Sequence, residues 1–505
     1  MTGVTELIVD GGPLTPGQVV EVARRRMRAV PGPGLAERMD PARAVVDAAV
    51  NSGEVVYGIT TGFGALASTH IGRDEAETLQ YNLIRSHASG VGDPIPDDLV
   101  RAILLLRART LAQGHSGVRP VLVERLLEML ERDILPVIPS QGSVGASGDL
   151  APFAHMALPL IGEGKVRVDG QVIPTSKTDL EPISLQAKEG LSLLNGTEGM
   201  TAMGALGLDE ARRLLIAADV ACAMTIEAMM GSARPFRSDI HHLRPHPGQI
   251  ASARRIAALI EDSEIGASHQ DDFDHAVQDA YSLRCAPQVH GAVADTLDHM
   301  EDVLTREMES VVDNPIVFPD TGEVVSAGNF HGQALAFVLD FATIAVSELG
   351  SISERRTDRL LDPARSRGLP AFLAPDPGVQ SGYMITQYVQ AALVAENKVL
   401  CHPASVDTIP TSGNQEDHVS MGWGAGKKLA QVLDNARRVI AIEILCATQG
   451  IEYRRPLSPG TGAGAVADLI REHVPTLDED RALSEEIETV AALIGDGSVA
   501  SAAAS

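Results

Sequence analysis

The distribution of hydrophobic and polar positions along the chain predicts several long helices. After Pro120, which suits the first turn of a helix, apolar residues recur at helical spacing until Pro136 ends the pattern. The same spacing extends much further over residues 197–230, 332–361 and 426–450. These three segments are far longer than the ordinary helix of about 11–12 residues, and long helices are typical of a bundle.

A different pattern occurs nearer the N-terminus. Residues 165–172 alternate between polar and apolar side chains, and Asp169-Gly170 lies where a tight turn is needed, so we expect a small β-hairpin. The chain is therefore predicted to be mainly α, with a smaller mixed region over residues 1–195 and a long-helix bundle with a C-terminal helical region over residues 196–505. No low-complexity or like-charge segment separates the two regions, so one continuous body is expected.

The composition agrees with a globular helical protein. Of the 505 residues, 44% are hydrophobic and only 3% are aromatic, so aliphatic side chains and alanine must fill the core. The net charge of −26 would repel both nucleic acid and an anionic membrane surface. Residues 1–30 lack the apolar stretch of a signal peptide, and no apolar run reaches the ~18 residues of a membrane span. The small residues at 499–505 have little to bury and are expected to fray.

The four cysteines have neither the paired spacing of a zinc site nor the density of a disulfide scaffold. They are Cys222, Cys285, Cys401 and Cys446. A cytoplasmic protein with reduced thiols fits this usage best, and neither nucleic acid nor membrane is expected as a partner.

Residues 142–152 combine glycines with polar side chains that a core would not select, and three interpretations compete for them. The first is a turn ahead of a helix capped by Asp149. The second is a serine nucleophile elbow, although Asp149 stands where that motif requires a glycine. The third is autocatalytic cyclisation, in which the Gly148 nitrogen attacks the Ala146 carbonyl carbon. Two waters are lost, one of them from Ser147, and a methylidene-imidazolone electrophile remains.

The Ala146-Ser147-Gly148 segment and the Asp-Leu-Ala-Pro that follows it resemble the signature of the aromatic amino acid ammonia-lyase family. The resemblance implies the long-helix fold of the aspartase and ammonia-lyase type. It also implies a 4-methylidene-imidazol-5-one (MIO) group formed from Ala146, Ser147 and Gly148, with no dissociable cofactor and no metal. A carbon–nitrogen lyase is therefore expected.

Two segments of the N-terminal region match the family as well. Tyr57 begins the glycine-rich stretch 57–64; alone it would be a surface anchor, whereas the resemblance makes it a lid residue and the favoured general acid or base. His87 lies in the stretch 82–90. By itself it would be a packed or capping histidine, whereas the resemblance places it in the side-chain pocket for the substrate.

The segment 278–285 supplies groups suited to an amino acid substrate. If this segment is helical, Tyr281 shares a face with both Gln278 and Arg284. A guanidinium group can donate two parallel hydrogen bonds to an α-carboxylate, although Arg284 alone would be an ordinary ion-pair partner. The resemblance implies that Arg284 binds the carboxylate, Tyr281 assists proton transfer and Gln278 positions the substrate. Many relatives have proline where this chain has Ala280.

Residues 412–421 carry an acidic pair beside a histidine, which could suggest a metal site, but no second nearby His or Cys completes one. The string instead resembles the histidine-specific members of the family. Glu416 can accept a hydrogen bond from an imidazole, whereas a phenyl ring offers it nothing. Gln415 is assigned to substrate binding by the same resemblance. Gly413 is a departure, because alanine is common there.

Two further residues and the assembly follow from the resemblance. Asn195 is expected to hydrogen-bond the MIO ring and Phe330 to pack beside it, although a turn asparagine and a core phenylalanine are the plain alternatives. The implied protein is a homotetramer whose active sites draw on more than one subunit.

The implied reaction is deamination of L-histidine to trans-urocanate and ammonia, the first step of histidine degradation. A phenylalanine or tyrosine lyase or an aminomutase would share the electrophile and differ in the pocket. A serine hydrolase would need an intact Ser147 hydroxyl, and an inactive relative would lack the Ala-Ser-Gly segment or Tyr57.

Overall fold

The computed structural model describes residues 6–53, 55–62, 64, 71–72, 75–269 and 277–504. The chain divides into two compact units, each assembled from three stretches. Unit 1 comprises Met1–Leu206, Glu301–Leu339 and Pro403–Lys427, and unit 2 comprises Gly207–Met300, Asp340–His402 and Lys428–Ser505. The first stretch of unit 1 ends near the predicted boundary at residue 195. The other two stretches belong to unit 1 and not to the helical bundle that the sequence predicts for residues 196–505.

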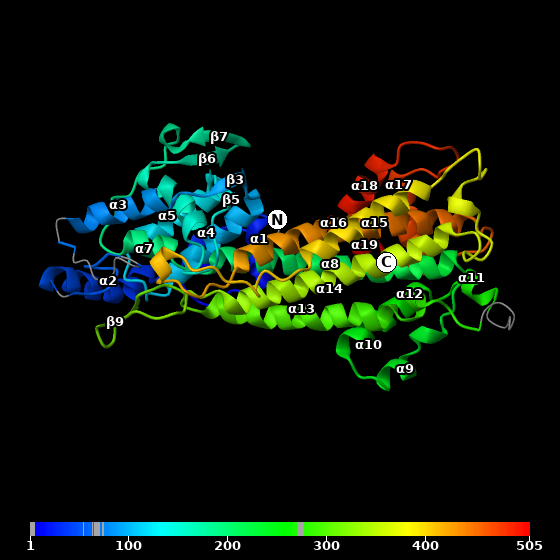
Figure 1. The fold of residues 1–505 in the computed structure, drawn as a ribbon, viewed down its shortest axis with the longest axis horizontal. Coiled ribbons are helices and arrows are strands. Elements are labelled where there is room, and N and C mark those ends of the chain that lie inside the picture. The colour runs from blue at the N-terminus through cyan, green and yellow to red at the C-terminus, as the bar shows by residue number, and fades with distance from the viewer. Residues whose placement is uncertain are drawn as a thin grey trace. The chain divides into compact units, whose positions relative to one another are not determined.

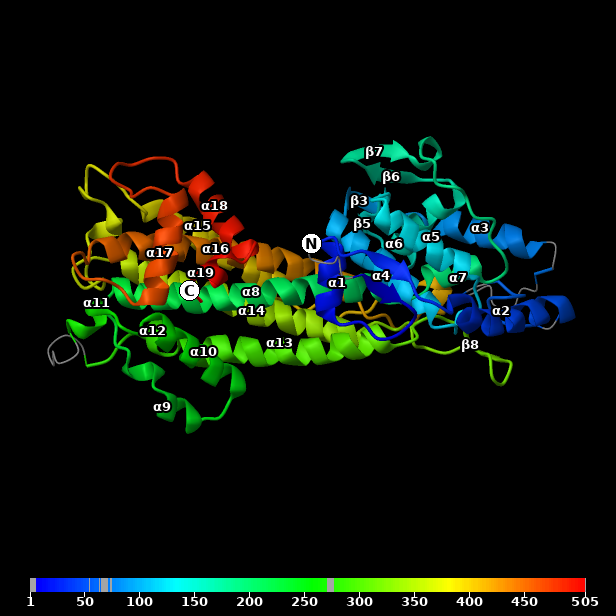
Figure 2. The same cartoon turned by 180° about the vertical axis from the view of Figure 1, so that it is seen from behind.

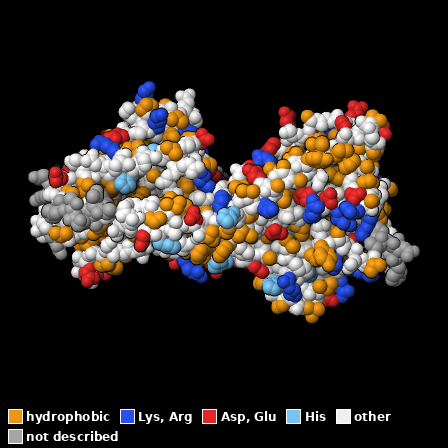
Figure 3. Space-filling model, viewed as in Figure 1, with side chains coloured by type: hydrophobic (Ala, Val, Ile, Leu, Met, Phe, Trp, Pro, Cys, Tyr) orange, Lys and Arg blue, Asp and Glu red, His pale blue; other side chains and the backbone are white. Residues whose placement is uncertain are grey.

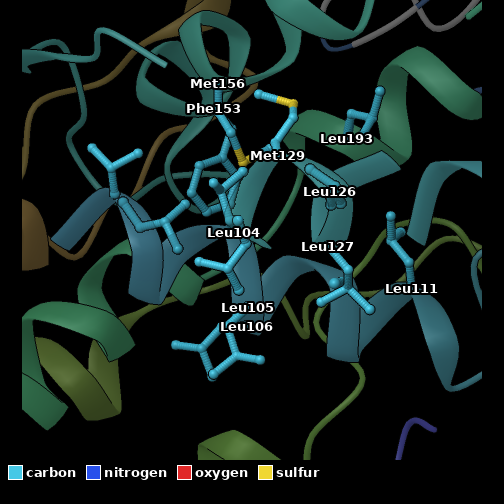
Figure 4. Close-up of a cluster of buried hydrophobic side chains, with 14 of the residues drawn as sticks. Leu104, Leu105, Leu106, Leu111, Leu126, Leu127, Met129, Phe153, Met156 and Leu193 are labelled. Carbon is cyan, nitrogen blue, oxygen red and sulfur yellow. The ribbon is translucent and has the colours of Figure 1, made fainter. Parts of the chain in front are cut away.

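Unit 1 is built around α4 (Asp97–Ala112), which is buried at every position from Leu99 onward. Leucines from α4 and α5 interdigitate in the core, and Phe153 and Met156 of α6 complete this cluster (Figure 4). The helices of unit 1 are α1 (Pro16–Ala23), α2 (Leu35–Ser52), α3 (Ala76–His87), α4, α5 (Pro120–Glu131), α6 (Leu150–Ala157) and α7 (Glu189–Leu194).

Unit 1 also contains short strands, which pair in small separate sheets: β1 with β2 in parallel, β3 with β5, β4 with β6 and β6 with β7, and β8 with β9. Their bounds are β1 (Leu7–Val9), β2 (Ala29–Pro31), β3 (Val91–Pro94), β4 (Leu135–Pro136), β5 (Pro139–Gln141), β6 (Lys165–Val168), β7 (Gln171–Pro174), β8 (Ile316–Phe318) and β9 (Glu323–Val325). The predicted hairpin is β6–β7. Its turn residues Asp169 and Gly170 have φ values of 49° and 76°, as a two-residue hairpin turn requires.

The four predicted helices are confirmed as α5, α8 (Glu198–Ala228), α14 (Gln333–Leu361) and α16 (Gly422–Glu452). In unit 2 the long helices lie side by side together with α13 (Ala286–Glu309) (Figures 1 and 2). The other helices of unit 2 are α9 (Ser238–His242), α10 (Pro247–Leu259), α11 (Glu264–Ala267), α12 (Tyr281–Arg284), α15 (Met384–Leu400), α17 (Thr461–His473), α18 (Ser484–Gly495) and α19 (Ser498–Ala502).

A buried ion pair fixes the register of helices in unit 2. Arg356 of α14 donates two hydrogen bonds to Glu443 of α16, at 2.5 and 2.8 Å, and Thr225 of α8 donates to the same carboxylate at 2.7 Å. Neither side chain of the pair is exposed to solvent. Because both charges are desolvated, each partner would be costly to bury without the other.

The C-terminal residues and the apolar helix α14 differ from what the sequence predicts. The prediction that the C-terminal residues fray is wrong over α19, because Val499 is buried there. No membrane-spanning run was predicted, yet among the described residues α14 is long and apolar enough to cross a membrane by length and composition. Of its most apolar window 61% is buried, and core helices pass the same test.

The four cysteines are free thiols.

Candidate functional site

The loop that carries Ala146-Ser147-Gly148 is fixed by a close backbone contact. Gly148 has a φ of +77°, and a Cβ atom added to it would lie 1.9 Å from the carbonyl oxygen of Gly196. The next residue, Asp149, donates its backbone N–H to the same oxygen at 2.9 Å. Only glycine can occupy position 148, both because of its left-handed backbone and because no space remains for a side chain.

Asp149 holds the loop from the protein interior. Its Oδ1 accepts a hydrogen bond from the Ser143 hydroxyl at 2.8 Å, and its Oδ2 accepts one from the Met200 N–H at 2.9 Å. It occupies the N-cap position of α6, but its side chain does not cap that helix, so the first of the three interpretations of this segment fails on its capping role. Burial raises the pKa of the Asp149 carboxyl to about 7, and the two hydrogen bonds oppose this rise.

A second segment, within Pro403–Lys427, lies against the same loop. The Met421 N–H donates to the Val144 carbonyl oxygen at 2.8 Å. The Ser420 hydroxyl donates to the Gly145 carbonyl oxygen at 3.0 Å. These two hydrogen bonds hold residues 420–421 against residues 144–145, and they determine which side chains lie opposite Ser147.

Glu416 is the residue of this segment that reaches the Ser147 side chain. The Ser147 hydroxyl donates to Glu416 Oε1 at 3.1 Å, and the Thr411 hydroxyl donates to Glu416 Oε2 at 2.5 Å. Thr411 and Glu416 also exchange backbone hydrogen bonds as an isolated antiparallel bridge. The Glu416 carboxylate is therefore held at both oxygens and at its backbone.

The turn between Thr411 and Glu416 is conformationally unusual. Ser412, Gly413 and Asn414 all have positive φ values, of 51°, 61° and 69°. Such backbone costs about 1 kcal/mol or more for each non-glycine residue, and it persists only where the surroundings enforce it. The glycine at position 413 is explained by its φ, because alanine there would add to this strain.

His87 lies at the C-terminal end of α3, close enough to Glu416 for their charges to interact. Its Nδ1 lies 2.9 Å from the Leu83 carbonyl oxygen, which can only accept, so Nδ1 carries the proton and Nε2 keeps its lone pair. Burial lowers the pKa of His87, while the Leu83 carbonyl and the Glu416 carboxylate act in the opposite direction. His87 is thus a neutral imidazole near pH 7.

Tyr57 lies in a turn beside the Glu416 segment. Its hydroxyl oxygen accepts a hydrogen bond from the Gly64 N–H at 3.3 Å, and its ring is half-buried. A Cβ atom on Gly64 would lie 2.5 Å from the Ser412 hydroxyl oxygen. The tyrosine loop and the strained turn therefore meet at Gly64, which places both in the same neighbourhood of unit 1.

Asn195, at the C-cap of α7, presents a polar atom that needs a partner. Its Nδ2 donates to the Asn314 carbonyl oxygen at 2.9 Å, and its own carbonyl oxygen accepts from the buried Arg107 at 3.0 Å. Its side-chain Oδ1 is buried and has no hydrogen-bond partner in the part of the chain that the structure describes. A buried acceptor without a partner, such as this Oδ1, can accept a hydrogen bond from a donor on a bound molecule.

The other two predicted site residues of unit 1 are partly or fully exposed to solvent. Phe330 is half-buried in the turn directly before α14, and Gln415 is exposed next to Glu416. The turn and the Glu416 segment meet through His331, whose Nε2 lies 3.2 Å from the His418 carbonyl oxygen. The two imidazole rings stack with an interplanar angle of 4°.

Gln278, Tyr281 and Arg284 belong to unit 2. The Arg284 guanidinium lies 4.6 Å from the centre of the Tyr281 ring, and its Nε donates to the Asp279 carbonyl oxygen at 3.0 Å. Tyr281 is 72% exposed, and Gln278 is exposed in the preceding bend. Tyr281 and Arg284 share a face of α12 as predicted, whereas Gln278 lies in the bend before this helix, so its predicted place on the same helical face is wrong. Ala280 has a φ of −61°, the value that a proline ring imposes, so this backbone would also accept proline.

Sequence reasoning missed three residues that shape this site: Ser143, the buried carboxyl of Asp149, and Thr411. Ser143 and Asp149 stood inside the recognised segment, but their mutual hydrogen bond depends on how the loop folds back. Thr411 precedes the recognised string by one residue. A hydroxyl five positions before a glutamate gives no signal of its own, because only the left-handed turn brings the two together.

A model of the aromatic amino acid lyase family matches residues 14–472. The chain belongs to the aromatic amino acid lyase family. The predictions of the family, of its mainly helical fold and of an ammonia-lyase are thereby confirmed.

Curated relatives and solved structures agree with this membership. A histidine ammonia-lyase from Gloeobacter violaceus is 52% identical over 495 residues, covering 97% of this chain and 96% of that protein. One from Deinococcus radiodurans is 53% identical over 468 residues, covering 92% and 89%. Among solved structures, histidine ammonia-lyase from Trypanosoma cruzi superposes with a TM-score of 0.91 at 42% identity, covering 99% and 95%. Tyrosine aminomutase from Streptomyces globisporus gives 0.94 at 38%, covering 99% and 98%.

The environment of His87 predicts its titration. In an NMR titration of the imidazole, with the signal assigned through His87→Gln, we expect a midpoint below 6.5, because burial disfavours the imidazolium. Glu416→Gln should lower the midpoint further, because it removes a negative charge that favours the imidazolium. A midpoint above 6.5, or a rise in Glu416→Gln, would contradict the described geometry.

Proposed function

We propose that this protein catalyses the non-oxidative deamination of L-histidine to trans-urocanate and ammonia. The observation that carries the proposal is the Glu416 carboxylate at 3.1 Å from the Ser147 hydroxyl, because it sets an acceptor for imidazole N–H beside the reactive segment. Relatives named histidine ammonia-lyase, at about half identity over nearly the whole chain, support the same substrate.

We propose that Ala146, Ser147 and Gly148 cyclise to the MIO group. The residues around them fit it: position 148 has no Cβ to obstruct the attacking nitrogen, and Asn195 Nδ2, which gives one N–H to Asn314, has a second N–H for the oxygen of the ring. Asn195 would then hold the ring and Phe330 would pack beside it. Once formed, the group supplies an electrophile for the substrate α-amino group, which unmodified side chains lack.

The substrate side chain is assigned to the groups around Glu416. The Glu416 carboxylate accepts a hydrogen bond from the substrate imidazole or pairs with the imidazolium. The same contact supports removal of the β-proton. The lone pair on His87 Nε2 offers an acceptor on the same side of unit 1, and Gln415 completes the polar lining. A phenyl ring would leave these groups without partners, and desolvation without a new hydrogen bond is costly.

The substrate backbone and the transferred proton are assigned to the remaining residues. Arg284 binds the α-carboxylate through its guanidinium fork, and Gln278 orients it. Tyr57 takes the β-proton, with Tyr281 assisting proton transfer. Tyr281 and Arg284 are pre-arranged for acting together, because the cation already lies over the ring.

Product formation tests this proposal. Purified protein given L-histidine should release ammonia and urocanate, whereas L-phenylalanine and L-tyrosine should give little cinnamate or coumarate. Ser147→Ala, which cannot form the electrophile, should lower histidine turnover by more than about 10³-fold while keeping the fold. The circular dichroism spectrum of this variant is the control. Full turnover by Ser147→Ala would refute the mechanism, and coumarate or β-tyrosine as the main product would indicate a different substrate pocket.

Imidazole recognition can be measured separately from turnover. In the Ser147→Ala background, Glu416→Ala should weaken urocanate binding by about tenfold or more, because a hydrogen bond to a charged group contributes about 1.5–3 kcal/mol. Cinnamate carries a phenyl ring in place of imidazole, so its affinity should change by less than about threefold. Isothermal titration calorimetry measures both, and equal losses for the two ligands would remove Glu416 from imidazole recognition.

We further propose a cytoplasmic homotetramer whose active sites draw on more than one subunit. α15 supports this, because Ile385, Tyr388 and Val389 share one helical face and are 59%, 63% and 40% exposed. Hydrophobic side chains lie among charged ones on the visible surface (Figure 3). The net charge of −26 disfavours nucleic acid or an anionic membrane as a partner.

Assembly can be tested on that helical face. Ile385→Asp should shift the sedimentation coefficient from tetramer to smaller species, because it places a charge in a desolvated interface, and it should lower turnover together with assembly. Val172→Asp is the matched control, because Val172 is 49% exposed on the β6–β7 hairpin and should assemble normally. A monomeric wild-type protein, or a tetrameric Ile385→Asp variant, would contradict the proposed interface.

A further inference from the structure

Formation of the MIO group requires that two oxygen atoms leave the chain as water. The first comes from the Ala146 carbonyl when the Gly148 nitrogen closes the ring. The second is the Ser147 hydroxyl, and hydroxide is a poor leaving group unless a proton reaches the oxygen as the bond breaks. Before cyclisation the chain carries that hydroxyl, and the contacts of the Ser147 side chain identify the groups that can supply the proton.

Glu416 is placed for this task. Its Oε1 lies 3.1 Å from the Ser147 hydroxyl oxygen, within the range for direct proton transfer. Its Oε2 accepts the Thr411 hydroxyl at 2.5 Å. A proton on Oε1 would face the Ser147 oxygen, because Oε2 is already occupied by the Thr411 hydroxyl.

We propose that Glu416 is the acid that expels the Ser147 hydroxyl as water while the MIO group forms, before any substrate binds. This inference rests on the proposed function for the identity of the group. The Cα–H bond of Ser147 breaks, and its electron pair forms the Cα=Cβ double bond. The Cβ–O bond breaks with its electron pair on oxygen, which takes the proton of Glu416 and leaves as water. The Cα proton passes to solvent, from which Glu416 is protonated again.

The surrounding contacts keep this acid in place. Thr411 bridges to the Glu416 backbone as well as to its carboxyl group, and Ser420 and Met421 tie the same segment to the loop that carries Ser147. The carboxyl group therefore cannot withdraw without breaking several hydrogen bonds. A glutamate on a free surface loop would spend little time at this distance.

Intact-protein mass separates the two steps, because each removes one water molecule. Protein made by cell-free synthesis is sampled over time for the wild type and for Glu416→Gln, which keeps the shape but cannot donate a full proton. We expect the wild type to lose two waters. Glu416→Gln should lose the first water normally and the second about 10²–10⁴-fold more slowly, so that a species lacking one water accumulates.

Two further sets of variants make the assignment specific. Asp417→Asn changes the neighbouring exposed carboxylate and should lose both waters at the wild-type rate. Thr411→Val removes the hydroxyl that positions Glu416 and should slow the second loss, and Thr411→Ser should restore it. The Thr411 variants also serve if Glu416→Gln does not fold.

The outcomes separate this inference from the proposed function. A wild-type chain that loses no water refutes the proposed function itself. A wild type that loses both waters and turns over histidine, while Glu416→Gln or Thr411→Val matures at the same rate, overturns only the role of Glu416 as acid. A folded Glu416→Gln variant that loses neither water also overturns it, because the block would then precede loss of the hydroxyl.

Discussion

The close approach of Gly148 to Gly196 is the constraint on which the site depends. It leaves no room for a Cβ atom, and it fixes the reactive loop against the residues that begin α8. Asp149 then inserts its carboxyl group behind the loop and joins Ser143 to the backbone of Met200. One backbone contact therefore sets the position of Ser147 and orients the helix that follows it.

Several unfavourable features gather around this contact. Burial holds the carboxyl group of Asp149 at a pKa of about 7, an acceptor on Asn195 lacks a partner among the described residues, and three successive residues of the turn at 412–414 have left-handed backbone. Each costs free energy, and such costs persist where function requires them. The large apolar core of unit 1, with α4 at its centre, offsets them.

Apolar residues at helical spacing predicted α5, α8, α14 and α16. Burial does not separate these helices from those that were missed, because α8 has no exposed residue, whereas α13 has exposed positions and was not predicted. α4 was also missed: it is buried at every position from Leu99 onward, and Arg101, Arg107 and Arg109 are buried with its apolar residues, so its polar positions mark no solvent-facing side. The reactive segment and Glu416 could be named from their motifs. Their contact at 3.1 Å and the role of Thr411 could not, because both depend on a strained turn that no local pattern encodes.

The order in which the three stretches of unit 1 are translated determines when the contact between Ser147 and Glu416 can form. Ser147 and Glu416 are separated by 269 positions, and the last stretch of unit 1 to leave the ribosome is Pro403–Lys427. A nascent chain that has exposed only the serine loop lacks the segment that packs against it. If the loop cyclises as we propose, the electrophile would form only after translation has passed residue 427, and fragments that end before Pro403 would remain chemically inert.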